Sequence, residues 1–300
     1  NLVQAQLPIP EYQKGKAILS GTIANYHPND NLIFKIGAPN IVMGTAETLY
    51  PTVESDGSFT INIPLYHHTQ VRMMIGNADL VILLSPEKET NVAINLSNPP
   101  GKQFVFSGQY ATINNEWCQP ELITKIPPVY SDGDLLDSIV GISANEFKKR
   151  CINQYKRYVT HNNAQLQFSE DTRTLANLSC AFDCLENLQA THYCLQTAYQ
   201  KKENITREQA FAAFLDVYLP DDFHNYLKDF PVNHPLALYC YNYRNVVMDL
   251  YDTHKDPLAY EKNLLKNAPL TKEEQTLIHQ YETAFKAGIS FQQESELMAL

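Results

Sequence analysis

Hydrophobic residues in the first third of the chain recur at every second position, the spacing of a β-strand with one buried face. Phe59, Ile61 and Ile63 alternate in this way directly after residues 54–57, whose Asp-Gly pair is typical of a tight hairpin turn. Residues 80–84 are apolar throughout, which predicts a central strand buried on both faces. The remaining predicted strands cover residues 17–23, 32–36, 45–50, 71–75, 92–96 and 103–106, with a loop at 37–40. Short strands separated by frequent turns favour an antiparallel β-sandwich of the immunoglobulin-like kind.

After residue 110 the apolar residues recur at intervals of three and four, which is typical of amphipathic helices. Ser143 and Glu146 form a capping box, which predicts a helix from there to about residue 160. Ser169 is the predicted cap of a longer helix that continues to about residue 202. Further helices are predicted at residues 206–218, from Pro235 to residue 250, from Thr271 to Gly288, and after Ser290. We therefore predict an α+β multidomain protein, with a β-sandwich domain at residues 1–110 and an all-α domain at residues 111–300.

The two patterns meet in residues 104–117, which contain the only tryptophan of the chain. Gly108 permits a bend that a residue with a β-carbon would resist. Thr112 or Asn114 is the predicted cap of the first helix. Two interpretations of Trp117 stay open. Its ring packs the first helix onto the sheet, or it stacks on a ligand.

Composition excludes several classes of partner. The chain has 300 residues, a formal net charge of −10 and no basic cluster. Nucleic-acid binding needs positive charge that displaces counterions from phosphates, so we expect no nucleic-acid partner. No apolar run approaches the ~20 residues that a transmembrane helix needs, so we expect no transmembrane segment.

The six cysteines all follow the predicted β-region, and none forms a Cys-x-x-Cys pair. Free cysteine is among the most frequently buried residue types, so buried reduced thiols are the expected state. Cys180, Cys184 and His192 are three candidate zinc ligands, but a structural zinc site needs a fourth, which the sequence does not offer. Phosphate-binding, dinucleotide-binding and hydrolase motifs are absent as well. We therefore predict no catalytic residue, no metal ligand and no cofactor in this chain.

Tyrosines are concentrated in one part of the helical pattern. Tyr239, Tyr241 and Tyr243 cannot all face the same way on one helix, so at least one is predicted to be exposed or to line a groove. Tyrosine is amphipathic and favoured at interfaces. These three residues and Trp117 are the candidate interface residues, and a tyrosine-rich edge of the core is the alternative.

The stretch Phe-x-Gly-x-Tyr-Ala-x-Ile-Asn-x-Glu at residues 106–116 resembles the segment that closes the N-terminal β-domain of a group of Bacteroidetes cell-envelope proteins. In that group a β-domain and a helical region precede a thioredoxin-like, TlpA-type thiol-disulfide oxidoreductase module. Residues 18–23, 56–59 and 81–86 fit the same pattern. Two features depart from it. Glu87 follows Pro86 where the family commonly has glycine, so we expect a different turn there, and the Trp-Cys-x-x-Cys site of the thioredoxin-like module is absent.

The resemblance implies a periplasmic or envelope-anchored protein. It implies that this chain is the non-catalytic N-terminal region of a thiol-disulfide oxidoreductase, which positions, docks or dimerises around a thioredoxin-like module. The expected partner is then a protein, either that module or its substrate, and a homodimer is a further expectation. The alternative is a stand-alone envelope module that binds a glycan, a peptide or a protein.

Overall fold

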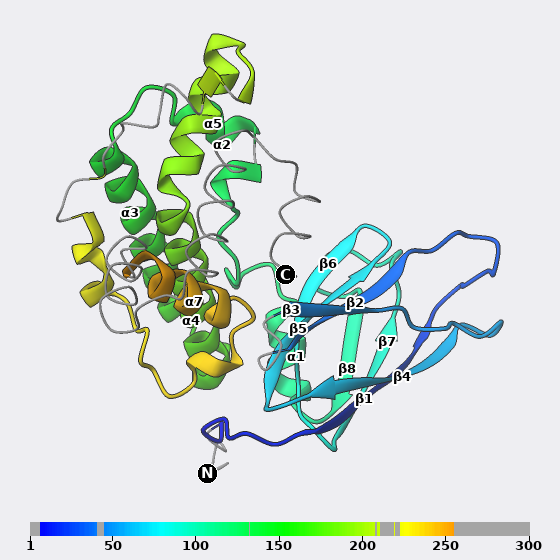
Figure 1. Cartoon of the computed structure of the whole chain (residues 1–300). Helices are drawn as coiled ribbons and strands as arrows, with labels where there is room; N and C mark the ends of the chain where they lie inside the picture. Colours follow the sequence, from blue (N-terminus) through cyan, green and yellow to red (C-terminus); the bar gives the residue numbers. More distant parts are fainter. Residues whose placement is uncertain are drawn as a thin grey trace, which may run out of the picture. The chain divides into compact units, whose positions relative to one another are not determined.

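The computed structural model describes residues 7–40, 45–131, 133–207, 209–210, 219 and 223–254. By their internal contacts, residues Asn1–Asp249 form one compact unit and Leu250–Leu300 a second. All the strands in the described part precede the helices (Figure 1), which confirms the predicted α+β class. The division of the chain into domains at residue 110 stays a prediction. The predicted helices after Thr271 lie outside the described residues, as does most of the helix predicted at 206–218.

The described strands form two four-stranded sheets (Figure 1). The first has the order β4 (Ser58–Leu65), β1 (Gly15–Ile23), β7 (Glu89–Ile94) and β8 (Phe104–Gly108). The second has the order β3 (Thr45–Leu49), β2 (Phe34–Asn40), β5 (Thr69–Ile75) and β6 (Ala78–Leu84). Buried apolar residues from both sheets form one hydrophobic cluster. Within it Phe34 and Phe59 meet edge to face, with ring centroids 4.9 Å apart.

One strand pair departs from the predicted antiparallel arrangement, because β1 and β7 run parallel. The chain reaches β7 only after it has passed through both sheets, so no tight hairpin sets the direction of this pair. Side chains alternate with a period of two in parallel and antiparallel strands alike, so the hydrophobic pattern does not reveal the direction.

Two further corrections concern the second sheet. β6 was predicted to be central but lies at the edge of the sheet, where contact with helix α1 (Ala111–Trp117) helps to bury its apolar end. The predicted loop at residues 37–40 instead continues β2, and Pro39 pairs with Ala46 of β3. Beyond Gly37, β2 pairs with β3 alone, and proline is tolerated where a strand has a free side.

Gly108 and Glu87 both adopt a left-handed backbone conformation. Gly108 has a φ of 86°, as the predicted bend requires, and a β-carbon there would lie 2.7 Å from the carbonyl oxygen of Glu89. Glu87 has a φ of 58°, so this turn adopts a conformation that glycine adopts readily, although a glutamate stands there. Two hydrogen bonds to the Lys16 backbone hold it, one accepted by the Glu87 carboxylate at 2.9 Å and one donated by the Glu87 N–H at 3.0 Å.

Helix α1 connects the sheets to the helical region, and its predicted caps are wrong. Tyr110 is the residue at the cap position, with a φ of 58° and no side-chain capping bond. Thr112 and Asn114 both lie inside the helix. The side chain of Asn114 points at β6 instead, where it hydrogen-bonds the backbone of Leu83.

The helical region contains α2 (Gly133–Ser138), α3 (Ala144–Ala164), α4 (Glu170–Gln189), α5 (Thr191–Glu203) and α7 (Tyr243–His254), with 3-10 turns at Val129–Ser131, Phe223–Asp229 and Ala237–Tyr239. Ser143 and Ser169 cap α3 and α4, as predicted. The helix predicted from residue 169 to 202 is broken at Ala190, beside which the Thr191 hydroxyl donates to the Leu188 carbonyl at 2.6 Å. Among the described residues no helix combines the length and the apolar character needed to cross a membrane.

The helix predicted from Pro235 begins only at Tyr243. Residues Ala237–Tyr239 form a 3-10 turn, and Cys240 has an extended backbone with ψ 132°. Tyr239, Tyr241 and Tyr243 therefore do not share one helix, and the assumption that they do is wrong.

Candidate functional site

A cleft of about 530 Å³ lies between the outer face of the second sheet and the helical region. Its floor includes Gln70 and Arg72 of β5, together with residues 78–81 of β6. Helix α4 contributes residues between Ser179 and Glu186, and the segment from Cys240 to Asn245 contributes a third side. All of these residues belong to the unit Asn1–Asp249.

Strand alternation explains why polar side chains face this cleft. Val71 and Met73 of β5 are fully buried in the core between the sheets, so Gln70 and Arg72 point to the opposite face. The Gln70 amide connects the walls of the cleft. It donates to the hydroxyl of Ser179 on α4 at 3.2 Å and accepts from the backbone N–H of Tyr241 at 3.0 Å.

A cluster of charges lies on the floor of the cleft. The Arg72 guanidinium binds both carboxylate oxygens of Asp79, at 2.7 and 2.6 Å, and Lys125 lies 3.7 Å from the same carboxylate. The hydrogen bonds from Arg72 lower the pKa of Asp79. Both side chains of the bidentate pair remain partly exposed, so we expect it to orient charge in the cleft more than to stabilise the fold.

Helix α4 places two carboxylates in the cleft wall. Asp183 is buried and accepts hydrogen bonds from the Ile126 N–H at 2.8 Å and the Asn242 amide at 2.7 Å. Burial raises the pKa of Asp183 to about 7, although these two hydrogen bonds oppose the shift. Glu186 accepts from the Tyr130 hydroxyl at 3.0 Å and from Asn242 at 3.2 Å, both of which are neutral groups.

Buried asparagines hold the chain that forms another side of the cleft. Asn162 of α3 accepts from the N–H of Ile123 at 2.9 Å and donates to its carbonyl at 2.8 Å. Asn187 of α4 accepts from the N–H of Val129 at 2.8 Å. Side-chain amides thus satisfy several backbone groups of residues 119–131, which follow α1 without a regular strand or helix until the turn at Val129–Ser131.

Two of the four candidate interface residues line the cleft. Trp117 ends α1 with 9% of its surface exposed. Tyr241 is half-buried, and its hydroxyl would lie 3.5 Å from a β-carbon built at Gly37, so its ring extends over the outer face of the second sheet. Tyr243 instead packs against Phe182 of α4, with ring centroids 5.2 Å apart.

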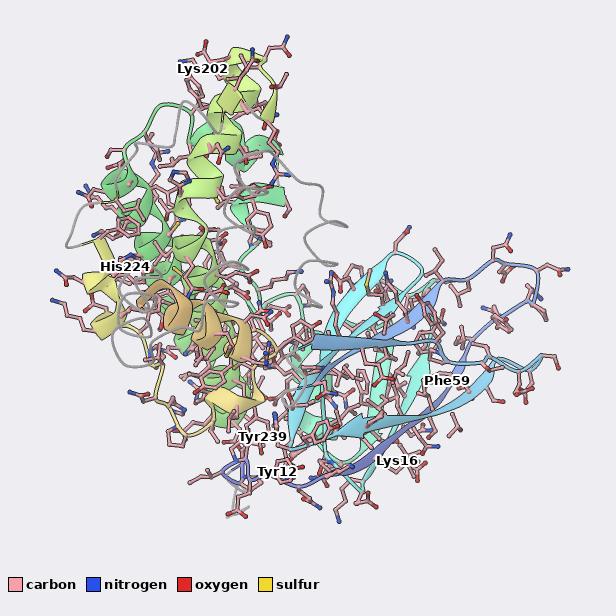
Figure 2. The ribbon with its side chains drawn as sticks, in the orientation of Figure 1. Tyr12, Lys16, Phe59, Lys202, His224 and Tyr239 are labelled. Atoms are coloured by element: carbon pink, nitrogen blue, oxygen red, sulfur yellow. The ribbon has the colours of Figure 1, made fainter. Side chains whose placement is uncertain are left out.

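Tyr239 lies elsewhere, where the helical region meets the N-terminal lead-in that contains Tyr12 (Figure 2). It is fully buried, and its hydroxyl donates to the carbonyl of Pro8 at 2.9 Å. Tyr110 and His68 complete this aromatic cluster, and the Tyr110 hydroxyl is hydrogen-bonded to the His68 ring. The structure therefore separates the predicted tyrosines into different environments.

The sequence pattern does not single out the polar residues of the cleft, among them Gln70, Asp79, Asp183 and Asn242. Asp183 leaves a visible signal, because it is an acidic residue between Phe182 and the pair Cys184 and Leu185 of α4. The others lie on alternate strand positions or in irregular chain, where a polar residue is ordinary.

The cysteines are free thiols, five of them buried and Cys118 half-buried. Burial raises the pKa of Cys118, Cys151, Cys194 and Cys240 to about 12, and those of Cys180 and Cys184 rise as well. Thiolate is the reactive form of cysteine, so these thiols are poor nucleophiles at neutral pH. No cluster of three or more histidine, cysteine or acidic side chains suited to a metal ion occurs in the described part of the chain.

Comparisons with known proteins give no family. No family model matches the chain, and no curated protein matches it. A solved structure from Bacteroides ovatus, described as a candidate cell adhesion protein, is similar over 32% of this chain with 11% identity and a TM-score of 0.20. That similarity spans 43% of the other chain, less than half of its length.

Proposed function

We propose that this chain is the non-catalytic binding region of a cell-envelope thiol-disulfide oxidoreductase. In this proposal the cleft beside β5 and β6 docks a protein, either a thioredoxin-like module or its substrate. The observation that carries the proposal is the cleft itself, where the aromatic rings of Trp117, Tyr130 and Tyr241 accompany a fixed set of charges. Aromatic anchors beside a few oriented polar groups are typical of binding sites.

The thiols support a binding role over a redox role. A dithiol catalyst needs an accessible thiolate and a second cysteine that resolves the mixed disulfide. Burial raises the thiol pKa and also blocks access of a protein disulfide to the sulfur. Cys118, the least buried of the six, also has its pKa raised to about 12 by burial.

The finer description of the fold is part of the proposal. The hydrophobic cluster shared by the two sheets supports an immunoglobulin-like sandwich at residues 1–110. A periplasmic or envelope-anchored location is proposed from the resemblance of residues 106–116 and accords with the other motifs that share it.

The test is a binding titration with a separately produced TlpA-type thioredoxin-like module. We expect isothermal titration calorimetry to detect binding, and Tyr241→Ala to weaken it at least tenfold because it removes an aromatic wall of the cleft. Tyr12→Ala is the matched control, because Tyr12 is 71% exposed and does not line the cleft. Equal affinities for the wild type and Tyr241→Ala would place docking elsewhere, and no binding at all would overturn the proposal.

A stand-alone binding module is the second candidate. The cleft combines tyrosine rings with the side-chain amides of Gln103, Asn242 and Asn245, which suits a glycan or a peptide as well as a folded partner. Binding to a glycan array that is lost in Tyr241→Ala, without binding to the thioredoxin-like module, would favour this alternative.

A further inference from the structure

Strand β6 is an edge strand, so one side of its backbone has no neighbouring strand. In its antiparallel pairing with β5, residues that exchange hydrogen bonds alternate with residues whose N–H and C=O groups point away from β5. Asn114 identifies the second set, because its side chain accepts from the Leu83 N–H at 2.7 Å and donates to the Leu83 carbonyl at 3.1 Å. The alternation has a period of two, so the N–H and C=O groups of Val81 and Asp79 also point outward.

These outward groups are covered differently along the strand. Leu83, beside α1, is 2% exposed and fully hydrogen-bonded on its outward side by Asn114. Val81 is half-buried, Asp79 is exposed, and both line the cleft. Within the described part of the chain, no backbone hydrogen bond reaches the outward N–H or C=O of either residue. The cleft therefore contains two consecutive unused positions of a sheet edge.

Two other edge strands of the described part, β8 and β4, are protected. On the edge strand β8, the side-chain amide of Asn115 covers Phe106 as that of Asn114 covers Leu83. It accepts from the Phe106 N–H at 2.7 Å and donates to the Phe106 carbonyl at 2.9 Å. Just before the edge strand β4, the Gly57 carbonyl accepts a hydrogen bond from the Ile23 N–H of β1. By alternation, the N–H and C=O groups of the even-numbered residues of β4 point away from β1. Pro64 is one of these residues and has no N–H, so it interrupts that edge. Proteins commonly protect free edges in these ways, because an open edge accepts any extended chain. The cleft side of β6 contains neither proline nor lysine at residues 78–82.

We infer that an extended polypeptide segment of a partner adds to β6 as a further strand, paired with the outward N–H and C=O groups of Asp79 and Val81. This inference rests on the proposed binding function and names the class of ligand. Asn114 shows the required chemistry, since an amide that offers one donor and one acceptor already occupies the next position. Only an extended peptide repeats that pair of groups at strand spacing.

Charge indicates which side chains the segment carries. On the floor of the cleft, Arg72 and Lys125 place two positive charges beside the single negative charge of Asp79, so this side is net positive. Glu186 contacts neutral hydroxyl and amide groups and so keeps an unbalanced negative charge. The whole chain has a net charge of −10 as well. Complementarity therefore favours a segment with lysine or arginine at a position that faces α4.

The probe is a library of random seven-residue peptides, selected against the immobilised full chain. Enriched peptides are then labelled with fluorescein and titrated by fluorescence anisotropy. Val81→Pro removes the outward N–H without removing a hydrogen bond to β5, and we expect it to weaken binding at least tenfold. Asn62→Pro is the matched control, because Asn62 is an outward-facing position of another edge strand, β4. We expect this variant to bind as the wild type does.

A second arm needs no change in the protein and remains decisive if Val81→Pro does not fold. Single N-methylation along an enriched peptide removes one N–H at a time, and affinity should fall at alternate residues only. No enrichment, or peptides indifferent to both Val81→Pro and N-methylation, would overturn the inference. A dimer seen by analytical ultracentrifugation that Val81→Pro dissociates would also overturn it, because the edge would then belong to a second copy of the chain.

The two proposals fail separately. Peptides that bind through β6 without any binding of a thioredoxin-like module would leave the inference standing and overturn the proposed function. Binding of the module that is sensitive to Tyr241→Ala but indifferent to Val81→Pro would do the reverse.

Discussion

The cluster between the two sheets and the core of the helical region contain different kinds of side chain. The cluster between the sheets is built from apolar residues, many of them fully buried, such as Leu19, Ile36 and Ile63. The helical region buries Asn162, Asp183 and Asn187 among its apolar residues, with 0%, 8% and 2% of their surfaces exposed. Each of these three hydrogen-bonds the backbone of the segment that follows α1.

Apolar and polar burial have different effects on the structure. Apolar burial stabilises the sheets without specifying direction, because the hydrophobic effect is non-directional. Buried amides and carboxylates require partners at a set distance and angle, so they determine the path of residues 119–131 and with it one wall of the cleft. We expect substitutions in the apolar join to affect stability most, and substitutions of the polar groups to affect it less.

The largest expected effect is at the join between the regions. Trp117→Ala should lower the free energy of unfolding by roughly 3–5 kcal/mol, because a large buried ring is replaced by a cavity. Urea denaturation followed by circular dichroism measures it. Val105→Ala, at an apolar residue that is 60% exposed, should cost within about 0.5 kcal/mol. A loss below about 1 kcal/mol for Trp117→Ala would mean that the ring contributes little to packing.

Asp183 should make stability depend on pH. Burial raises its pKa in the folded protein to about 7 from the ordinary value of 3.8, so the folded state binds more protons between these values. Its contribution is therefore fully present below about pH 4 and is lost as pH rises through 7, on the order of 4 kcal/mol in total. Urea denaturation from pH 4.5 to 7.5 should show a stability difference between wild type and Asp183→Asn that changes with pH. A constant difference would contradict the raised pKa.

Replacing the buried Asn162 should have a smaller effect on stability. Asn162→Ala leaves the N–H and carbonyl of Ile123 without their partner, which should cost about 1–3 kcal/mol. Asn153→Ala on the same helix is the control, because Asn153 is exposed and its loss should be within about 0.5 kcal/mol. Equal losses of stability in the two variants, measured by thermal unfolding, would show that the hydrogen bonds of Asn162 do not stabilise the protein.

The smallest expected effect is on redox chemistry. Insulin reduction with dithiothreitol as electron donor should proceed at the rate of the protein-free control, because burial raises the pKa of every thiol. An enhancement that disappears in Cys118→Ser would assign the chain a redox function and contradict the binding proposal.

Local rules predicted much of the secondary structure. Strand alternation located Phe59 and Ile63, and the hydroxyl caps located the starts of α3 and α4. The same rules failed where a side chain serves a distant strand. Asparagine is a residue type that commonly caps helices, yet Asn114 lies inside α1. Its amide binds the backbone of Leu83, which is 31 residues away in the chain.

What the sequence determined by itself is local: the change of hydrophobic period near residue 110, the capped helix starts, and the bend at Gly108, whose φ of 86° suits glycine. The tertiary structure decided which strands are edges, that β7 runs parallel to β1, and that Trp117 and Tyr241 line one cleft while Tyr239 does not. The physical reason is that strand order and direction are set by long-range pairing, which leaves the period of side chains unchanged. The cleft and the open edge of β6 are products of that pairing.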